Sequence, residues 1–185
     1  ILIEHSIDKA LESKLFKKII VVISKRPKKL IDKYKGKRIK FVIGGKERKD
    51  SSLNALKKIR NEKPNNVLIH DAARPNFSIS LLKNLIKLLR NNYAVVPYIN
   101  SIDSIKYKIN KKLINLNRDN IYLTQTPQAF KFKKLYQLAS KEKGVITDEA
   151  SLFIKNNLNI KLVRGENKNN KITFLEDVKK PLTYY

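Results

Sequence analysis

Asn66-Val67-Leu68-Ile69-His70-Asp71-Ala72-Ala73-Arg74-Pro75 is the stretch whose pattern is most informative about the fold of this chain. Its short apolar run, Val67 to Ile69, is typical of a strand that is buried on both faces, as in parallel sheets covered by helices. Pro75 prevents the strand from continuing. Asp71 therefore follows the carboxyl end of a central strand, at the edge of an open α/β sheet where ligands bind.

The pattern leaves two interpretations of Asp71 open. A lone carboxylate at this edge is a hard oxygen ligand of the kind that Mg²⁺ takes together with substrate phosphates. Alternatively, Asp71 caps the following helix, and Arg74 is its partner on the surface.

Apolar runs and amphipathic segments alternate along most of the chain. Runs typical of strands occur at 18–24, 39–43 and 93–97, and apolar residues at helical spacing lie between them. Asp50 or Ser51 is expected to cap the helix that follows the second run. This alternation predicts an α/β fold with a mostly parallel sheet and right-handed crossovers, in a single domain over residues 1–185.

The alternation breaks between about residues 100 and 124. Two short strands around Asn110-Lys111-Lys112 predict an inserted β-hairpin arm. The edges of such a hairpin are exposed, and pairing with a second chain is one way of covering them.

Composition excludes several kinds of site. The chain has 42% hydrophobic and 31% charged residues, which indicates a globular protein rather than a disordered one. It has no cysteine, so disulfides, zinc–thiolate sites and cysteine nucleophiles are excluded. His5 and His70 are the only histidines, which argues against a histidine-rich metal site. No membrane span or signal peptide is visible in the sequence, so we expect a cytoplasmic location.

The formal net charge of +25 raises the alternative of a non-catalytic basic module that binds nucleic acid. Such a module needs clustered cations and stacking aromatics on one face. The lysines are instead spread along the whole chain, which favours a solvated surface without a specific nucleic-acid partner.

Several residues form a set suited to anions. Gly45 and Ser51 lie between a strand and a helix, where free N–H groups suit an anion or a base edge. Arg118 lies on the return of the hairpin, Thr147 at an expected helix N-terminus, and Lys171 in an expected short strand after a polar loop. Together with Asp71, the set suggests phosphoryl or nucleotidyl transfer, which depends on positioning and charge neutralisation.

Six motifs occur in order along almost the whole chain. They are Gly44-Gly45-Lys46-Glu47-Arg48-Lys49-Asp50-Ser51, Ile69-His70-Asp71-Ala72-Ala73-Arg74-Pro75, Asp103-Ser104-Ile105-Lys106, Gln125-Thr126-Pro127-Gln128-Ala129-Phe130, Thr147-Asp148-Glu149-Ala150-Ser151 and Asn170-Lys171-Ile172-Thr173. The set resembles the 2-C-methyl-D-erythritol 4-phosphate cytidylyltransferase family of isoprenoid biosynthesis. The resemblance implies a homodimeric, Rossmann-like nucleotidyltransferase that joins CTP to methylerythritol phosphate, releases pyrophosphate and uses Mg²⁺.

The resemblance also implies a role for each matched residue. Gly45 and Ser51 would contact the cytidine, and Asp71 would bind Mg²⁺ beside the CTP phosphates. The remaining matched residues would bind the second substrate: Arg118 and Lys171 would position the methylerythritol phosphate for attack, and Ser104, Thr126 and Thr147 would help to hold it. In the family the hairpin reaches into the neighbouring subunit, so Ser104 and Arg118 would serve the partner's site. Ser104 stands where the family usually has Thr.

The sequence departs from the family at its start. The family begins with a strand and a Gly-rich loop with an Arg, followed by a Lys, which bind the triphosphate; here the match begins at Ile1, after that region. We therefore expect an N-terminally truncated chain that is inactive alone. Two enzyme alternatives stay open: a ribitol-5-phosphate cytidylyltransferase, which often has Val where Ala73 stands, and a fusion that continues into a cyclodiphosphate synthase.

Overall fold

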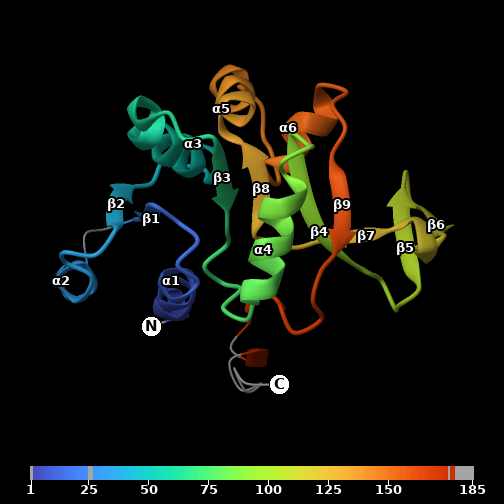
Figure 1. The fold of residues 1–185 in the computed structure, drawn as a ribbon. Coiled ribbons are helices and arrows are strands. Elements are labelled where there is room, and N and C mark those ends of the chain that lie inside the picture. The colour runs from blue at the N-terminus through green and yellow to red at the C-terminus, as the bar shows by residue number, and fades with distance from the viewer. Residues whose placement is uncertain (1, 25–26, 175, 178–185) are drawn as a thin grey trace.

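The computed structural model describes residues 2–24, 27–174 and 176–177, and helices alternate with strands along most of this length (Figure 1). The first elements are α1 (Leu2–Glu12), β1 (Ile19–Ile23), α2 (Lys28–Lys33), β2 (Ile39–Ile43), α3 (Arg48–Ile59), the 3₁₀ turn η1 (Arg60–Glu62), β3 (Asn66–Ile69) and α4 (Ile79–Leu88). They are followed by β4 (Ala94–Asn100), β5 (Ile105–Ile109), β6 (Lys112–Leu116), η2 (Arg118–Asn120), β7 (Tyr122–Thr124), β8 (Gln128–Lys131), α5 (Phe132–Lys141), α6 (Ala150–Lys155) and β9 (Lys161–Arg164). The predicted α/β class is confirmed.

The described strands form two sheets and a separate hairpin. β1 and β2 pair in parallel. The larger sheet has the order β3-β8-β4-β7, with β9 paired to β4. β8 is antiparallel to both β3 and β4, and β9 is parallel to β4, so β3, β4 and β9 share one direction. The strands of this sheet that alternate with helices therefore run in one direction, as predicted, whereas β7 and β8 run in the opposite direction.

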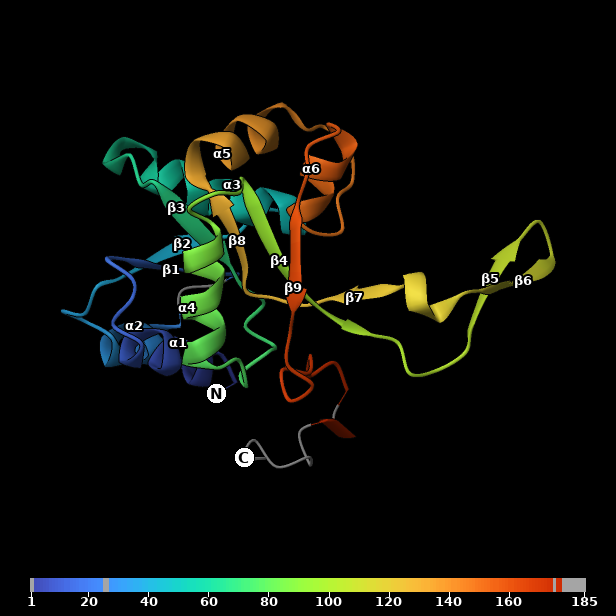
Figure 2. The same cartoon turned by 45° about the vertical axis from the view of Figure 1, so that its right-hand side comes forward.

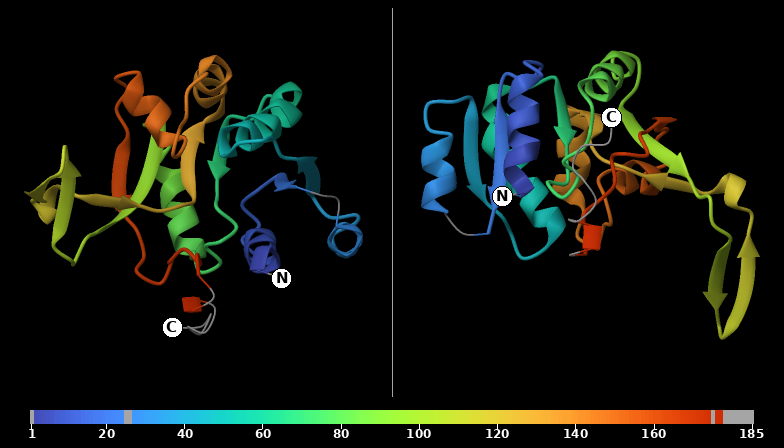
Figure 3. Two further views of the ribbon diagram at one scale, coloured as in Figure 1. Left: turned by 180° about the vertical axis from the view of Figure 1, so that it is seen from behind. Right: turned by 90° about the horizontal axis from the view of Figure 1, so that it is seen from below.

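Helices cover both faces of the larger sheet (Figures 1 and 3). Successive side chains of a strand point to opposite faces, which explains how one strand serves two cores. Val95 on β4 and Ala129 on β8 pack against α4. Their neighbours Ala94, Val96 and Phe130 pack in a second cluster with α5, α6 and one leucine of α3. β3 lies at the edge of this sheet, and not at its centre as the sequence analysis expected, and the candidate site lies at its carboxyl end.

The hairpin arm, residues 100–124, starts and ends where β4 pairs with β7 in the larger sheet, and between these strands it extends away from the sheets (Figure 2). β5 and β6 form its end, joined through Asn110 and Lys111, which both have positive φ angles of 44° and 69°. Two successive residues in this conformation give a tight hairpin turn whose twist matches the strands. The predicted arm is confirmed.

Three local predictions were wrong. α3 begins at Arg48 with Glu47 as its N-cap, because the side chains of Glu47 and Asp50 each accept the other's backbone N–H; Ser51 lies inside the helix. α6 begins at Ala150, so Thr147 precedes the helix instead of starting it. Lys171 does not lie in a strand; the next residue's N–H donates to the carbonyl oxygen of Ala73 at 2.8 Å.

Candidate active site

The turn after β3 places Asp71 beside the start of β8. The Arg74 N–H donates to the carbonyl oxygen of Asp71 at 2.9 Å, which closes the turn. β8 runs antiparallel to β3 and pairs Gln128 with Ile69, so the residues just before β8 lie next to the residues just after β3. The Asp71 N–H accordingly donates to Oγ1 of Thr126 at 3.0 Å.

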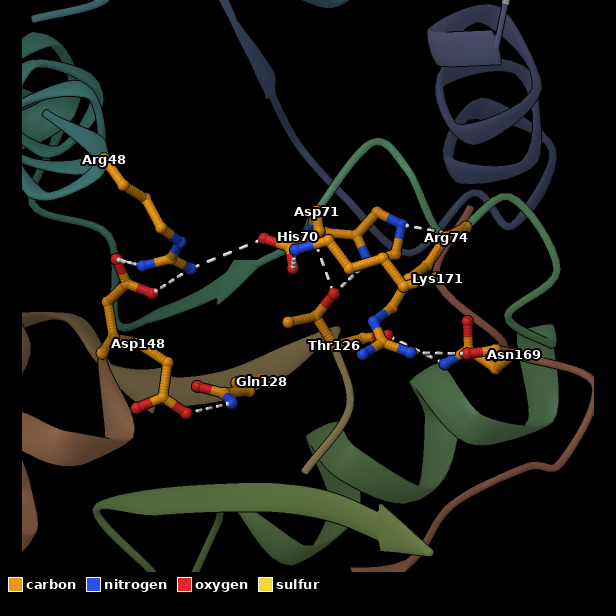
Figure 4. Close-up of polar contacts among 10 residues, drawn as sticks. Arg48, His70, Asp71, Arg74, Thr126, Gln128, Asp148, Asn169 and Lys171 are labelled. Carbon is orange, nitrogen blue, oxygen red and sulfur yellow. Dashed lines mark hydrogen bonds and ion pairs between the residues drawn. The ribbon is translucent and has the colours of Figure 1, made fainter. Parts of the chain in front are cut away.

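The Asp71 carboxylate lies between two cations (Figure 4). Its Oδ1 is 3.6 Å from Nη2 of Arg48, and its Oδ2 is 3.4 Å from Nζ of Lys171. The side chain is 23% exposed, so a ligand can reach it. The alternative of a helix-capping Asp71 is wrong, because Ser78 caps α4 through its Oγ and the Arg74 guanidinium donates to the carbonyl oxygen of Asn169.

Arg48 joins Asp71 to a buried carboxylate. Its Nη1 and Nη2 donate to the two carboxylate oxygens of Glu149 at 2.9 and 2.8 Å, and the Glu149 side chain is only 1% exposed. Burial of Arg48 acts to lower its pKa, but the hydrogen bonds and charge of Glu149 outweigh burial and raise the pKa above its usual value. Arg48 is therefore a fixed cation beside Asp71, tied to α6 by a bidentate ion pair.

His70 lies behind Asp71 with its ring edge-on to Phe77, at a centroid distance of 4.5 Å. Its Nε2 is 3.0 Å from the carbonyl oxygen of Arg74, and its Nδ1 is 3.1 Å from Oγ1 of Thr126. Removal of the ring from water lowers the pKa of His70 to about 4, which outweighs the opposite effects of the Arg74 carbonyl and the Asp71 charge. The ring is therefore neutral near pH 7.

We expect the free energy of unfolding to fall as the pH is lowered from about 6.5 to about 4, because the unfolded chain binds a proton on His70 that the folded chain excludes. This contribution of His70 to the free energy of unfolding is complete above pH 6.5, the pKa of the ring in the unfolded chain. It is lost as the pH falls toward 4, the pKa of the ring in the folded chain, and it amounts to about 3 kcal/mol. Denaturant titrations at several pH values measure it. His70→Gln cannot titrate and should flatten this part of the profile; an unchanged slope would contradict the assignment.

A cross-linked loop, residues 165–169, leads to Lys171. The Gln125 side chain donates to the carbonyl oxygen of Glu166 at 2.9 Å and accepts from the Glu166 N–H at 3.1 Å. The Asn169 side chain donates to the carbonyl oxygen of Thr126 at 2.8 Å. These bonds attach the loop to the residues before β8, so Thr126, which accepts from the Asp71 N–H, and Lys171, which pairs with the Asp71 carboxylate, meet at one residue.

Gly45 and Ser51 lie at the start of α3, close to Arg48. The Gly45 N–H donates to Oγ of Ser51 at 3.1 Å. A Cβ added at Gly45 would lie 2.1 Å from Cβ of Asp50, so only glycine fits this approach of the loop to the helix. Gly45 and Ser51 are therefore in contact just after β2, a strand that pairs with β1 in a sheet separate from that of β3.

Thr147 is exposed in the loop before α6. The following Asp148 accepts a hydrogen bond from Nε2 of Gln128 at 2.8 Å and another from the Ser151 N–H at 3.0 Å. These bonds fix the start of α6 and with it Glu149. Thr147 therefore lies two residues before Glu149, the partner of Arg48, but no contact joins it to Asp71 among the residues described.

Ser104 and Arg118 belong to the hairpin arm, just before β5 and at the start of η2. The arm extends away from β3, whose carboxyl end leads to Asp71 (Figures 1 and 2). Ser104 Oγ accepts a hydrogen bond from Nζ of Lys106 at 3.0 Å. Arg118 donates to the carbonyl oxygen of Ile102 at 2.7 Å. The chain itself therefore brings Thr126 and Lys171 to Asp71 and places Gly45 and Ser51 on either side of Arg48 in the sequence, and it leaves the two arm residues apart.

Several residues of the site carry contacts that the sequence analysis did not predict. They are Arg48, His70, Gln128, Asp148, Glu149 and Asn169. All belong to the six motifs or their immediate neighbours, so position within a motif was the signal that could have identified them. Within the described part of the chain, no three His, Cys, Asp or Glu side chains lie close enough together to form a metal site. None of the described helices has the length and apolar character that a membrane span needs.

The comparisons with known proteins agree on one family. The profile described as IspD, 2-C-methyl-D-erythritol 4-phosphate cytidylyltransferase, matches residues 1–183. The chain is 47% identical over 178 residues to the bifunctional enzyme IspD/IspF of Pelagibacter ubique (strain HTCC1062), covering 96% of this chain and 48% of that protein. It is 36% identical over 187 residues to the 2-C-methyl-D-erythritol 4-phosphate cytidylyltransferase of Thermosipho melanesiensis (strain DSM 12029 / CIP 104789 / BI429), covering 96% of this chain and 82% of that protein.

The fold is similar to a solved structure as well. The crystal structure of 4-diphosphocytidyl-2C-methyl-D-erythritol synthase from Anaerococcus prevotii DSM 20548 superposes with a TM-score of 0.87 at 32% identity, covering 96% of this chain and 82% of that one. The chain thus spans about half the length of its bifunctional relative. The profile match over nearly all of the sequence and the shared fold show that this chain belongs to the 2-C-methyl-D-erythritol 4-phosphate cytidylyltransferase family.

Proposed function

We propose that this chain carries the activity that joins CTP to 2-C-methyl-D-erythritol 4-phosphate, with release of pyrophosphate, in isoprenoid precursor synthesis. The observation that carries the proposal is the Asp71 carboxylate at the ligand edge of the sheet, with Lys171 3.4 Å and Arg48 3.6 Å away. A carboxylate that can bind a metal, set among cations that can face phosphates, suits a reaction between two phosphate-bearing substrates.

Asp71 fits the Mg²⁺ that the family implies. Mg²⁺ binds in such sites through one or two carboxylates and completes its coordination with substrate phosphates and water. A single reachable carboxylate matches this need, and its two cations lie at ion-pair distances rather than at the 2.8–2.9 Å of the Arg48–Glu149 hydrogen bonds. The metal would supply charge neutralisation to the triphosphate.

The reaction needs positioning more than proton transfer. An oxygen of the acceptor's ionised phosphate would attack the α-phosphorus of CTP, and the bond to pyrophosphate would break with its electron pair on the leaving group. Lys171 and, from the partner subunit, Arg118 would orient the acceptor phosphate, and Ser104 and Thr147 would contact the acceptor. Gly45 and Ser51 would face the cytosine, since backbone groups that approach closely can read a base edge.

The arm supports a homodimer in which Ser104 and Arg118 reach the partner's site. Directly paired residues of β5 and β6 share one face of the hairpin, and this face carries Tyr107 opposite Ile114. Both side chains are exposed in the isolated chain. A second subunit would cover this apolar face. The Mg²⁺, the dimer and a cytoplasmic location all stay predictions.

We expect the double substitution Tyr107→Lys and Ile114→Lys to convert a dimer into a monomer, because it places two charges on the apolar face of the arm. Leu113→Lys is the matched control, because Leu113 pairs with Lys108 on the opposite face and is 70% exposed. Sedimentation at roughly tens of micromolar, well above a micromolar dissociation constant, reports the oligomeric state. A parent chain that is already monomeric there would contradict the role of the arm.

The function is tested with the chain in its natural, full-length reading frame. Pyrophosphate release is measured with CTP, ATP, GTP or UTP, Mg²⁺, and either methylerythritol phosphate or ribitol 5-phosphate. We expect release with CTP and methylerythritol phosphate, and selective thermal protection by CTP of about 2.7 kcal/mol at roughly a hundredfold excess over its dissociation constant.

Other outcomes select the alternatives. Pyrophosphate release with ribitol 5-phosphate but not with methylerythritol phosphate would identify ribitol 5-phosphate as the acceptor. Equal protection by all four nucleotides that disappears as salt is raised, without turnover, would favour nonspecific polyanion binding by the +25 chain.

A further inference from the structure

A chain of hydrogen bonds runs behind Asp71 and is not used by the proposed contacts with metal or nucleotide. It begins at the Asp71 N–H, which donates to Oγ1 of Thr126 at 3.0 Å. It continues from this oxygen to Nδ1 of His70 at 3.1 Å, and from Nε2 of His70 to the carbonyl oxygen of Arg74 at 3.0 Å. The Arg74 N–H donates back to the Asp71 carbonyl oxygen at 2.9 Å, so the bonds close a ring around the turn.

The chemistry of these groups fixes the direction of every bond. A carbonyl oxygen only accepts, so Nε2 of His70 carries a hydrogen and donates it to Arg74. In the neutral ring Nδ1 is then an acceptor, and the Thr126 hydroxyl donates its single hydrogen to it. The same hydroxyl oxygen accepts from the Asp71 N–H. Every donor in the ring is matched by one acceptor.

This arrangement commits the Thr126 hydroxyl to the protein. Thr126 is 5% exposed, and its only hydroxyl hydrogen is directed at His70, so none is left to donate to a substrate phosphate. The His70 ring is held in turn by its edge-on contact with Phe77 at 4.5 Å. In this geometry Thr126 can therefore meet a substrate only as an acceptor, and not as the donor to the acceptor's phosphate.

We propose that His70 and Thr126 are positioning residues that fix the backbone of Asp71 and thereby hold its carboxylate between Arg48 and Lys171. The inference rests on the proposed function, because the position of this carboxylate affects turnover only if it takes part in the reaction. Groups that orient a metal-binding side chain from behind are typically worth about 10–100-fold in metal affinity or activity.

Paired substitutions separate this role from simple support of the fold. Thr126→Val keeps the shape and removes the hydroxyl, whereas Thr126→Ser keeps it. His70→Gln can still donate toward the Arg74 carbonyl but leaves Thr126 without its acceptor, whereas His70→Asn keeps an oxygen near the place of Nδ1. We expect Thr126→Val and His70→Gln each to lower kcat or raise the half-saturating Mg²⁺ concentration by about 10–100-fold, with Thr126→Ser and His70→Asn closer to the parent.

The double variant gives the decisive comparison. If both residues act through one hydrogen-bond chain, Thr126→Val with His70→Gln should lose little more than either single variant. Losses that multiply would overturn the proposal. A lower melting temperature with unchanged kcat and Mg²⁺ dependence in the folded variants would also overturn it, because that result describes structural support alone.

A second measurement needs no turnover. Nitrogen chemical shifts of the two histidine rings at about pH 7.5 report which ring nitrogen carries the hydrogen, and the exposed His5 supplies the reference for a solvated ring. We expect His70 with hydrogen on Nε2 only, and a changed Nδ1 signal in Thr126→Val. Hydrogen on Nδ1 would overturn the proposed chain. A parent protein that passes this measurement yet shows no cytidylyl transfer would instead refute the proposed function.

Discussion

Asp71→Asn in the full-length protein is expected to lower turnover by a factor on the order of 10²–10³, because the amide cannot supply the anionic oxygens that a magnesium ion needs beside the substrate phosphates. The melting temperature should stay near that of the parent. The side chain is partly exposed, and its two ion pairs are at 3.4 and 3.6 Å, longer than hydrogen-bonded contacts. Steady-state kinetics over a series of Mg²⁺ concentrations measures the loss.

Asp32→Asn is the matched control for this substitution. Asp32 is an exposed aspartate on α2, among helices that pack against β1 and β2 rather than at the end of β3. The same chemical change there should leave turnover unaltered. Turnover of Asp71→Asn equal to that of the parent at saturating Mg²⁺ would remove Asp71 from the active site.

Arg48→Ala is expected to destabilise the fold by about 3–5 kcal/mol, because it leaves the carboxylate of Glu149 buried without its partner. In a chain of this size the loss corresponds to a fall in melting temperature on the order of 10 °C. Activity should fall as well, since Arg48 also lies beside Asp71. Thermal and denaturant unfolding of the parent and the variant measure the effect.

The two members of this pair are not equivalent, and their difference supplies the control. Arg48 is 35% exposed and Glu149 only 1%, so water can solvate the arginine when Glu149 is replaced, but not the glutamate when Arg48 is replaced. Glu149→Gln should therefore cost less than Arg48→Ala, and the combined variant should regain part of the loss. A Glu149→Gln variant that is the less stable of the two would contradict this account.

The sequence contained enough information to predict the elements but not their partners. Val67, Leu68 and Ile69 form the predicted strand, because apolar residues at every position let it pack on both faces. The strand is half-buried at the edge of its sheet, however, rather than buried at its centre, because β8 is its neighbour on one side only among the described strands. The hairpin turn at Asn110 was likewise predictable, because local turn chemistry determines it. Most elements that depend on nearby residues or on the period of the pattern were predicted correctly, whereas the short strand expected at Lys171 is absent from the described structure.

Contacts between distant segments could not be predicted in this way. Arg48 and Glu149 are 101 positions apart, and neither spacing nor composition distinguishes a buried glutamate from a solvated one. The start of α3 was missed for a related reason. Either Asp50 or Ser51 alone was expected to cap the helix, whereas Glu47 and Asp50 cap it together. The candidate site was therefore predictable as a list of residues, but not as a set of contacts.

The cross-linked loop of residues 165–169 limits how the gene can vary. A Cβ at Gly165 would lie 2.5 Å from Oε1 of Gln125 and 3.0 Å from the carbonyl oxygen of Tyr98, so even one added carbon has no room. An inserted or deleted codon there would also shift Lys171 relative to Asp71. The exposed hairpin tip at Asn110 has no such constraint. Purifying selection should therefore act more strongly on the length of the loop than on the length of the arm tip.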